Sequence, residues 1–194
     1  MDKIKMAVIG AGGVWGQTHI SIYKEHPLAE VTAICDIDKN SAYDAAEKHC
    51  IPKEYVYTDY KEMLRSADID AVAIVTPDFA HTDIAIACAE AKKHMIIEKP
   101  LATTEDDVYR MMDAIEKNNV RAMVDLHNRW SPPFNKAWQE IRSGKLGSPC
   151  TAYFRLNDVK WVATDMLKWA EKSSILWFLG SHSLDTLRWL IGSE

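Results

Sequence analysis

The chain has 194 residues, of which 47% are apolar and 26% are charged, a composition typical of a globular rather than a disordered protein. The formal net charge is −5 and no cluster of Lys and Arg stands out, so the sequence argues against a nucleic-acid partner and an anionic membrane surface. No apolar run approaches the ~18 residues of a membrane span. Four scattered cysteines without a CxxC pair predict reduced thiols in a cytoplasmic protein, and we expect no metal site.

Short apolar runs alternate with segments of helical periodicity over the first 124 residues. The runs predict strands that are covered on both faces, and the longer segments predict helices. The expected strands are 4–9, 30–35, 71–75, 94–97 and 120–124, and the expected helices are about 14–25, 40–49, 59–65, 81–92 and 104–118. This alternation predicts an α/β fold for residues 1–124, a Rossmann-type doubly wound parallel sheet.

Residues 125–194 have a different texture, with six of the seven tryptophans beyond position 129. They predict the beginning of a second, α+β domain that is incomplete. Its expected elements are a helix from Pro132 to about Arg142, a turn at 143–147, a strand at 149–157 and a short helix at 182–190 that ends at Gly192.

The first expected strand runs directly into a glycine-rich turn. Gly10 permits a tight turn, Gly12 lets the backbone approach a pyrophosphate, and Gly16 lets the following helix pack closely on the strand. The N-terminus of that helix offers free N–H groups to the anion. The spacing is GxGxxxG, one residue longer than the commonest form. The residues expected to contact a dinucleotide here are Gly10, Gly12, the spare glycine Gly13, Val14 and Trp15.

An acidic residue at the end of the second expected strand favours NAD over NADP. Asp36 lies 20 residues after Gly16, where a carboxylate accepts hydrogen bonds from the adenosine ribose and repels a 2′-phosphate. Asp38 competes for this role, and the alternative for Asp36 is that it caps the next helix.

Further motifs lie in order along the rest of the chain. They are TPDFAH at 76–81, Glu98-Lys99-Pro100 within 91–102, Asn128-Arg129-Trp130 followed by Pro133, and GSHSLD at 180–185 followed by Arg188-Trp189-Leu190. Together they resemble the glucose–fructose oxidoreductase/inositol dehydrogenase (Gfo/Idh/MocA) family. The resemblance implies NAD-dependent chemistry on a small hydroxylated substrate. Because family members are considerably longer, it also implies a chain truncated in its C-terminal domain, and the exposed apolar surface of a partial domain favours a homo-oligomer.

Lys99 is the first catalytic candidate. It follows the expected strand 94–97, at the carboxyl edge of the sheet where ligands bind, and Pro100 restricts its backbone. The resemblance implies that Lys99 reaches the substrate hydroxyl beside the nicotinamide and relays or abstracts its proton. The alternative is a surface lysine that pairs with Glu98.

His182 is the second catalytic candidate, and the resemblance implies a general acid/base or a ligand of a substrate hydroxyl. The alternative is a capping or packed histidine. Many members of the family have an Asp four residues before this His, whereas this chain has Phe178. Asp185 is a partial substitute only if it points toward the imidazole.

The resemblance implies cofactor contacts from Thr76, Pro77, His81, Glu98 and Lys99, and substrate contacts from Lys99, Asn128 and His182. A helix-start cap is the alternative for His81. The other candidates are His127 near the substrate, Arg129 near the nicotinamide or at the domain interface, and Trp161 and Trp169, which either stack on a sugar or pack in a core.

The leading hypothesis is therefore an NAD-dependent oxidoreductase that acts on a sugar, a polyol or a related compound. One alternative is an NAD-binding protein without turnover, including an inactive fragment. Another is NAD-assisted glycoside cleavage, which would release a leaving group without net NADH.

Overall fold

The computed structural model describes residues 2–192, and the chain divides into two compact units, Met1–Val124 (unit 1) and Asp125–Glu194 (unit 2). Among the helices in residues 2–192, none has both the length and the apolar character that crossing a membrane requires.

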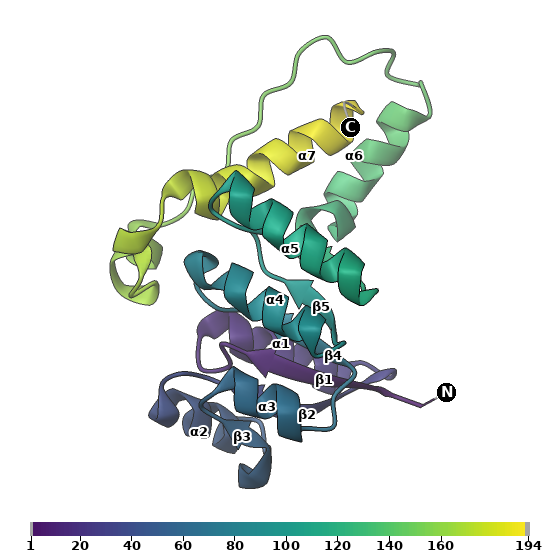
Figure 1. Cartoon of the computed structure of the whole chain (residues 1–194). Helices are drawn as coiled ribbons and strands as arrows, with labels where there is room; N and C mark the ends of the chain where they lie inside the picture. The colour runs from purple at the N-terminus through teal and green to yellow at the C-terminus, as the bar shows by residue number, and fades with distance from the viewer. Residues whose placement is uncertain (1, 193–194) are drawn as a thin grey trace. The chain divides into compact units, whose positions relative to one another are not determined.

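Unit 1 is built on one parallel sheet (Figure 1). The order β3-β2-β1-β4-β5-β6 reverses between β1 and β4, and this switch point is where doubly wound sheets bind their ligands. The six-stranded sheet confirms the predicted Rossmann-type fold. Its strands are β1 (Ile4–Ile9), β2 (Ala29–Cys35), β3 (Val56–Tyr57), β4 (Ala71–Ile74), β5 (His94–Ile97) and β6 (Ala122–Val124).

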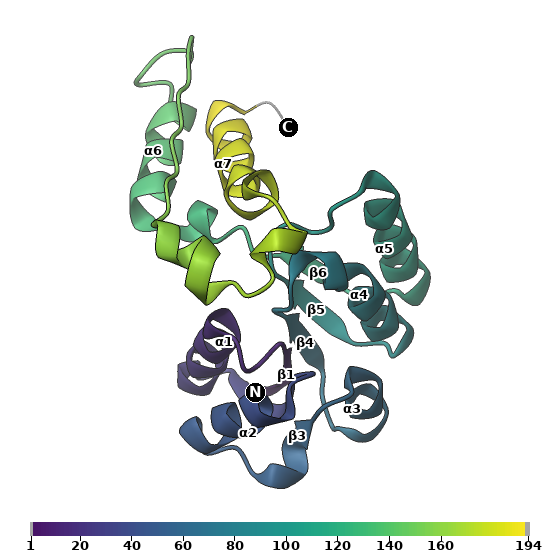
Figure 2. The same cartoon turned by 90° about the vertical axis from the view of Figure 1, so that its left-hand side faces the viewer.

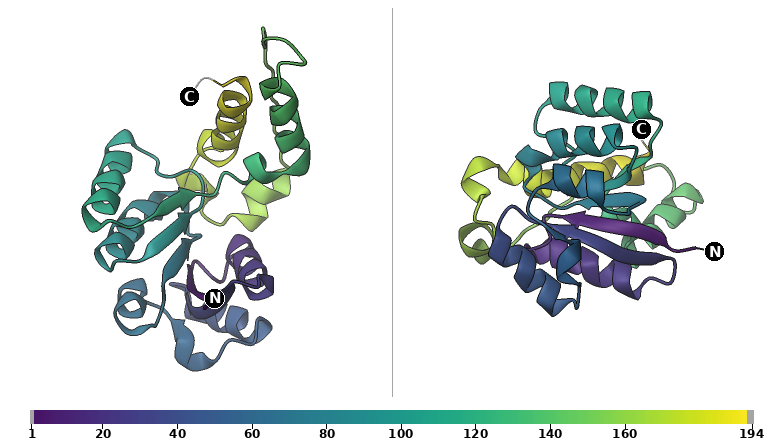
Figure 3. Two further views of the ribbon diagram at one scale, coloured as in Figure 1. Left: turned by 90° about the vertical axis from the view of Figure 1, so that its right-hand side faces the viewer. Right: turned by 60° about the horizontal axis from the view of Figure 1, so that its bottom comes forward.

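Five helices cover the two faces of this sheet. Figures 2 and 3 show α1 and α2 on one face and α3, α4 and α5 on the other. The helices are α1 (Val14–Glu25), α2 (Lys39–Lys48), α3 (Tyr60–Ser66), α4 (His81–Glu90) and α5 (Glu105–Asn118), with short 3₁₀ turns η1 (Lys53–Tyr55) and η2 (Asp78–Ala80).

The sheet has an apolar core on each face. In β1, Met6 and Val8 pack into the core that contains Ile20 of α1, whereas Ala7 and Ile9 pack into the core that contains α3, α4 and α5 residues. Successive side chains of a strand point to opposite faces, so a sheet covered on both sides needs an apolar residue at nearly every strand position. This requirement explains the short, uninterrupted apolar runs of the sequence.

β3 was not predicted from the sequence, whereas the end of α5 was predicted correctly. β3 has only two residues and pairs with the end of β2, so the sequence contains no apolar run there. Thr104 caps α5 by accepting a hydrogen bond from the Asp107 N–H. Asn119 ends α5 in the left-handed conformation, with φ 53°.

Unit 2 is helical in its described part. Its long helices α6 (Pro132–Arg142) and α7 (Ser181–Ile191) pack together, and the rings of Trp138 and Trp189 stack with centroids 5.6 Å apart. Gly192 ends α7 with φ 78°, as predicted. The shorter helical turns are η3 (His127–Trp130), η4 (Val162–Met166), η5 (Ala170–Lys172) and η6 (Leu176–Gly180).

The predicted strand at 149–157 is wrong. These residues form no regular secondary structure, and the side chain of Tyr153 is 84% exposed. A strand needs a neighbouring strand to pair its backbone groups, and residues 125–192 contain none. The described part of unit 2 therefore does not show the predicted α+β character.

Candidate functional site

The glycine-rich turn folds tightly against the ends of β2 and β4. The Gly10 and Ala11 N–H groups donate to Cys35 O at 2.8 and 3.1 Å, which turns the chain across the end of β2. Gly10 has φ +88°, and a Cβ on it would lie 2.4 Å from Val75 O. A Cβ on Gly16 would lie 2.0 Å from Gly10 O. The turn therefore needs glycine at both positions for backbone packing.

The first turn of α1 fits an anionic ligand. Gly13 is its N-cap, no side chain caps it, and no acidic residue lies in its first turn. Uncapped N–H groups at the positive end of a helix favour a phosphate or pyrophosphate. A Cβ on Gly12 would lie 2.4 Å from Ser41 Cβ, so only glycine fits there, whereas a Cβ on Gly13 would meet nothing closer than 3.7 Å. Gly13 is thus the spare glycine, as the spacing indicated.

Val14 and Trp15 follow this N-cap with exposed side chains. Two apolar side chains beside an uncapped helix end offer a surface for the uncharged parts of a ligand. The residues of the turn therefore fit a dinucleotide by backbone space, polarity and apolar contact.

Asp36 and Asp38 have separate roles. Asp38 caps α2 by accepting a hydrogen bond from the Ser41 N–H at 2.7 Å. Asp36 Oδ2 accepts from the Gly12 N–H at 2.9 Å, and its Oδ1 accepts from the Asp38 N–H at 3.0 Å. The alternative that Asp36 caps α2 is wrong, because its carboxylate faces the glycine-rich turn instead.

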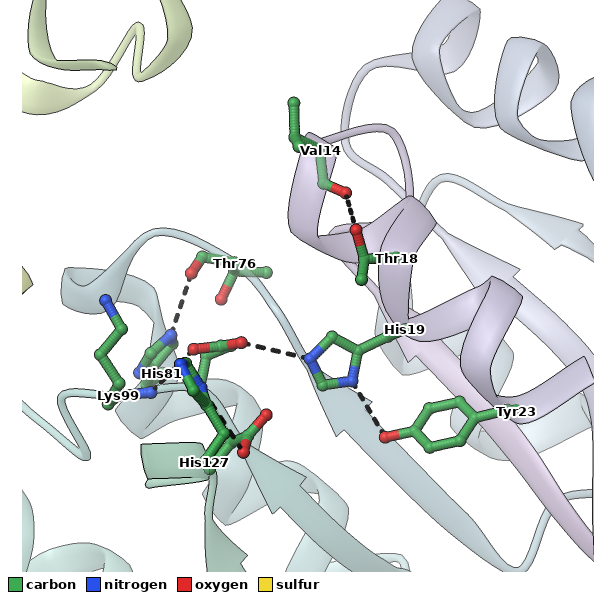
Figure 4. A network of polar contacts seen from close by, with 10 residues as sticks. Val14, Thr18, His19, Tyr23, Thr76, His81, Lys99 and His127 are labelled. Carbon is green, nitrogen blue, oxygen red and sulfur yellow. Dashed lines mark hydrogen bonds and ion pairs between the residues drawn. The ribbon is translucent and has the colours of Figure 1, made fainter. Parts of the chain in front are cut away.

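His81 bridges the segments that follow β4 and β5. It is the first residue of α4 and is 1% exposed. Its Nε2 lies 2.9 Å from Thr76 O (Figure 4), and its Nδ1 lies 2.9 Å from Pro100 O. The ring does not cap α4, the alternative considered from the sequence, because both nitrogens face these two carbonyl oxygens. Thr76 and Pro77, which follow β4, are partly buried.

Glu98 lies in a partly buried polar cluster at the end of β5. Its Oε1 lies 3.2 Å from His19 Nε2, and its Oε2 accepts a hydrogen bond from the Lys99 N–H at 3.2 Å. His19 Nδ1 lies 3.0 Å from the Tyr23 hydroxyl (Figure 4). Burial raises the pKa of the Glu98 carboxyl, but the His19 hydrogen bond and the nearby charges of His19 and Lys99 outweigh it, so the pKa lies below its ordinary value. The Lys99–Pro100 peptide bond is cis.

Sequence reasoning missed His19 and Tyr23, although a signal was present. Gly16, His19, Ile20 and Tyr23 follow the i, i+3, i+4, i+7 spacing of one helix face, and Gly16, His19 and Ile20 are buried. A histidine on the buried stripe of the helix that follows a glycine-rich turn requires a polar partner. Here those partners are Glu98 and Tyr23.

In unit 2, Asp185 pairs with Arg129. Asp185 accepts from Arg129 Nε at 3.0 Å and from Nη2 at 2.6 Å, a bidentate arrangement. The suggested substitution of Asp185 for the missing Asp at the Phe178 position is therefore not seen. The Asn128 amide donates to Thr186 Oγ1 at 3.4 Å, so α7 holds Asn128 as well as Arg129.

His182 lies in the first turn of α7 and is buried. Its ring meets the ring of His127 edge-on, with centroids 4.6 Å apart. Phe178 lies in η6 and brings no carboxylate. Trp161 is 56% exposed and Trp169 is partly buried. Unit 2 thus brings together two imidazoles.

Unit 1 gathers its candidate residues because the strands are parallel. The glycine-rich turn follows β1, Asp36 follows β2, Thr76 and Pro77 follow β4, and Glu98 and Lys99 follow β5. The carboxyl ends of parallel strands meet at one edge of the sheet. A glycine-rich turn, an uncapped helix N-terminus and an acidic residue at the switch point of a doubly wound sheet define a dinucleotide-binding domain.

The family follows from comparison with known sequences. Residues 4–126 match the profile described as "Oxidoreductase family, NAD-binding Rossmann fold", the Gfo/Idh/MocA family. The chain belongs to this family and contains its NAD-binding Rossmann domain.

Three similar proteins illustrate the range of the family. The chain is 29% identical over 192 residues to the uncharacterized oxidoreductase YrbE of Bacillus subtilis, covering 99% of this chain and 55% of the relative. It is 28% identical to myo-inositol 2-dehydrogenase of Thermotoga maritima, covering 98% of this chain and 56% of the relative. A crystal structure of an Agrobacterium radiobacter oxidoreductase in complex with NAD⁺, L-tartaric acid and magnesium superposes with a TM-score of 0.86 at 25% identity, covering 98% of this chain and 55% of the other. The chain thus spans about half the length of these relatives.

Proposed function

We propose that this chain belongs to an NAD-dependent oxidoreductase that transfers hydride between nicotinamide and a hydroxyl-bearing carbon of a sugar, polyol or related compound. In this proposal residues 1–124 bind the cofactor, and residues 125–194 begin the substrate domain. The observation that carries this proposal is that Lys99 lies at the same sheet edge as the glycine-rich turn, with its backbone N–H bonded to the partly buried carboxylate of Glu98. The inositol dehydrogenase among the relatives supports a polyol-like substrate.

The charge of Asp36 supports NAD over NADP. Its carboxylate lies against the Gly12 N–H, within the turn that fits a pyrophosphate. A ribose hydroxyl can donate to this carboxylate, whereas a 2′-phosphate would meet a like charge. Gly10, Gly12, Gly13, Val14 and Trp15 complete the proposed cofactor contacts, together with Thr76 and Pro77.

When bound, NAD supplies the hydride acceptor. The Lys99 amine accepts the proton of the substrate hydroxyl during oxidation and returns it during reduction. The His182 imidazole serves as a second proton carrier or as a hydroxyl ligand, and Asn128 orients the substrate. Glu98 and His81 act through the backbone next to Lys99 and Thr76 rather than on the substrate.

One observation favours a second candidate function, NAD binding without turnover. Phe178 cannot orient an imidazole, and Asp185 is engaged by Arg129 rather than by His182. With Phe178 in place of the Asp that many family members carry four residues before this histidine, the chain would retain the cofactor site and lose one carboxylate of the proton relay.

The first test is calorimetric titration of the chain with NAD and NADP. We expect tight NAD binding and weak NADP binding, and we expect Asp36→Ala to abolish the preference. Asp38→Ala is the matched control, because it removes an α2 cap and leaves the carboxylate at the turn. Equal affinity for both dinucleotides in the unmodified chain would contradict the role of Asp36.

The second test is NADH formation on a panel of polyols and sugars. We expect Lys99→Met to reduce kcat by about 10²–10⁴-fold, the usual contribution of a positioned acid or base, while NAD binding persists. NAD binding without NADH formation on any compound would favour the second candidate function.

A further inference from the structure

The N-terminal side of Lys99 is fixed by a pair that is largely shielded from solvent. His19 of α1 and Glu98 have side chains only 10% and 13% exposed, and their closest atoms lie 3.2 Å apart. The other Glu98 oxygen accepts the Lys99 N–H. A buried carboxylate is expensive to leave without donors, so these contacts strongly restrict where the Lys99 peptide can lie.

The C-terminal side of Lys99 is fixed by a second buried histidine. His81 of α4 faces Pro100 O through Nδ1 and Thr76 O through Nε2, both at 2.9 Å. A neutral imidazole donates to one of these carbonyls and a protonated one to both. The ring therefore lies between the residue after Lys99 and the segment that follows β4.

We propose that His19 and His81 form a two-histidine clamp that positions the Lys99 side chain. The two rings reach the Glu98-Lys99-Pro100 segment from α1 and α4, which cover opposite faces of the sheet (Figures 2 and 4). This inference rests on the proposed function, in which Lys99 carries the proton. His19 and His81 are positioning residues, because each acts on Lys99 through its neighbour.

The clamp matters because a lysine has a long, flexible side chain. Its four rotatable bonds give it freedom that catalysis must restrict. Anchoring the peptide on both sides of Lys99 removes backbone freedom, so the amine samples a smaller volume at the sheet edge. Supporting contacts of this kind hold a reactive group within the narrow range that catalysis needs.

The test compares Asn and Gln at each histidine. The amide group of Asn extends about as far from the backbone as Nδ1 of histidine, and the amide group of the longer Gln extends about as far as Nε2. His19 contacts Glu98 through Nε2, so His19→Gln keeps the clamp and His19→Asn breaks it. His81 contacts Pro100 through Nδ1, so the order is reversed: His81→Asn keeps the clamp and His81→Gln breaks it.

The readout is the rate at which an amine-reactive reagent modifies Lys99 in the whole chain, measured by peptide mass spectrometry. The exposed Lys117 of α5 serves as the internal reference. We expect the two clamp-breaking variants to change the ratio of Lys99 to Lys117 labelling by roughly three- to tenfold, and the two clamp-keeping variants by less than about twofold. His49→Asn is the matched control, because His49 is also buried but lies at the end of α2.

Circular dichroism and NAD titration verify that each variant is folded. Equal labelling ratios in all four variants, or the same order of Asn and Gln at both positions, would overturn the clamp. This result is distinguishable from failure of the proposed function. If Lys99→Met retains NADH formation, the catalytic role of Lys99 is wrong, and the labelling ratios still report whether the histidines hold the segment.

Discussion

Gly16→Ala tests how closely α1 packs on the end of β1. A Cβ at this position would lie 2.0 Å from Gly10 O and 2.9 Å from Ala11 Cα, whereas Cβ atoms almost never approach another atom within 3.0 Å. Both obstacles are backbone atoms, so no side-chain rotation relieves the overlap and α1 must withdraw by about 1 Å. Overpacking of this kind costs about 3 kcal/mol at the upper end of its usual range.

Helix propensity offsets part of this cost. Gly16 lies inside α1, where alanine is favoured over glycine by about 1 kcal/mol. The net loss in the free energy of unfolding is therefore about 2 kcal/mol, which corresponds to a fall in Tm of about 4–8 °C for a chain of this size. Urea denaturation should show a lower midpoint with an unchanged slope.

Gly13→Ala is the matched control, because its Cβ would meet nothing closer than 3.7 Å. Because Gly13 is the N-cap of α1, we expect Gly13→Ala to lower the free energy of unfolding by less than about 1 kcal/mol. If Gly16→Ala proves as stable as Gly13→Ala, the close approach of α1 to β1 does not constrain this fold, and the reading of the glycine spacing is wrong.

Two further predictions concern the buried and partly buried charges. The pKa of Glu98 is lowered in the folded chain, so its carboxylate stabilises the fold above the unfolded value, 4.5, and this contribution is lost as the pH falls through the lower folded value. Melting curves should therefore show a shallower decline of Tm below about pH 5 in Glu98→Gln than in the unmodified chain, and parallel curves would contradict the cause given for the shift. Arg129→Lys should lower the stability of unit 2 by about 1 kcal/mol, because lysine cannot bind Asp185 in a bidentate manner and solvent already screens a side chain that is 34% exposed. A double-mutant cycle with Asp185→Asn measures the coupling free energy between the two side chains. A coupling free energy near zero would show that the two side chains are close together without stabilising unit 2.

The sheet of unit 1 was largely predictable because its signals are local. Each longer strand is a short apolar run, and covering both faces makes that run uninterrupted. β3 escaped prediction because two residues, Val56 and Tyr57, give no pattern, and the strand exists only through pairing with the end of β2. The need for Gly16 was predictable for the same local reason, since a Cβ there would meet Gly10 and Ala11 backbone atoms within the turn, whereas the backbone that requires glycine at position 10 belongs to Val75 at the end of β4.

The prediction of a strand at 149–157 was wrong because alternating apolar and polar residues are not sufficient to form a strand. The pattern states which side chains would share a face, but pairing requires backbone groups of another strand at about 4.8 Å. Residues 125–192 provide no such strand, and the segment is left without regular structure. A prediction from alternation is therefore weak wherever the expected neighbour strands are absent from the sequence.

The candidate site likewise contains residues whose positions were predictable from local patterns and residues whose positions depend on contacts distant in the sequence. Residues at strand ends, such as Asp36 and Lys99, were predictable because a parallel sheet brings all its carboxyl ends to one edge, whatever the side chains do. His19 was not, because its role depends on Glu98, which lies 79 residues away in the sequence. The same holds for Asp185, whose partner Arg129 is 56 residues away and cannot be read from helical spacing.

One signal of the long-range contacts was nevertheless present in α1, where a histidine lies on the apolar face of the helix. A helix that must bury Gly16 and Ile20 against the sheet also buries His19, which lies between them on the same face. An imidazole buried in this way costs free energy unless a partner meets it, and the partner must come from the strand ends that this face of α1 overlies. Among the expected strand ends, the tripeptide at 98–100 offers a carboxylate beside the lysine already expected to act on substrate. Polar residues on otherwise apolar helix faces therefore indicate which strand-end residues a doubly wound domain holds in place, and the crossed Asn and Gln variants test that reasoning at both faces of the sheet.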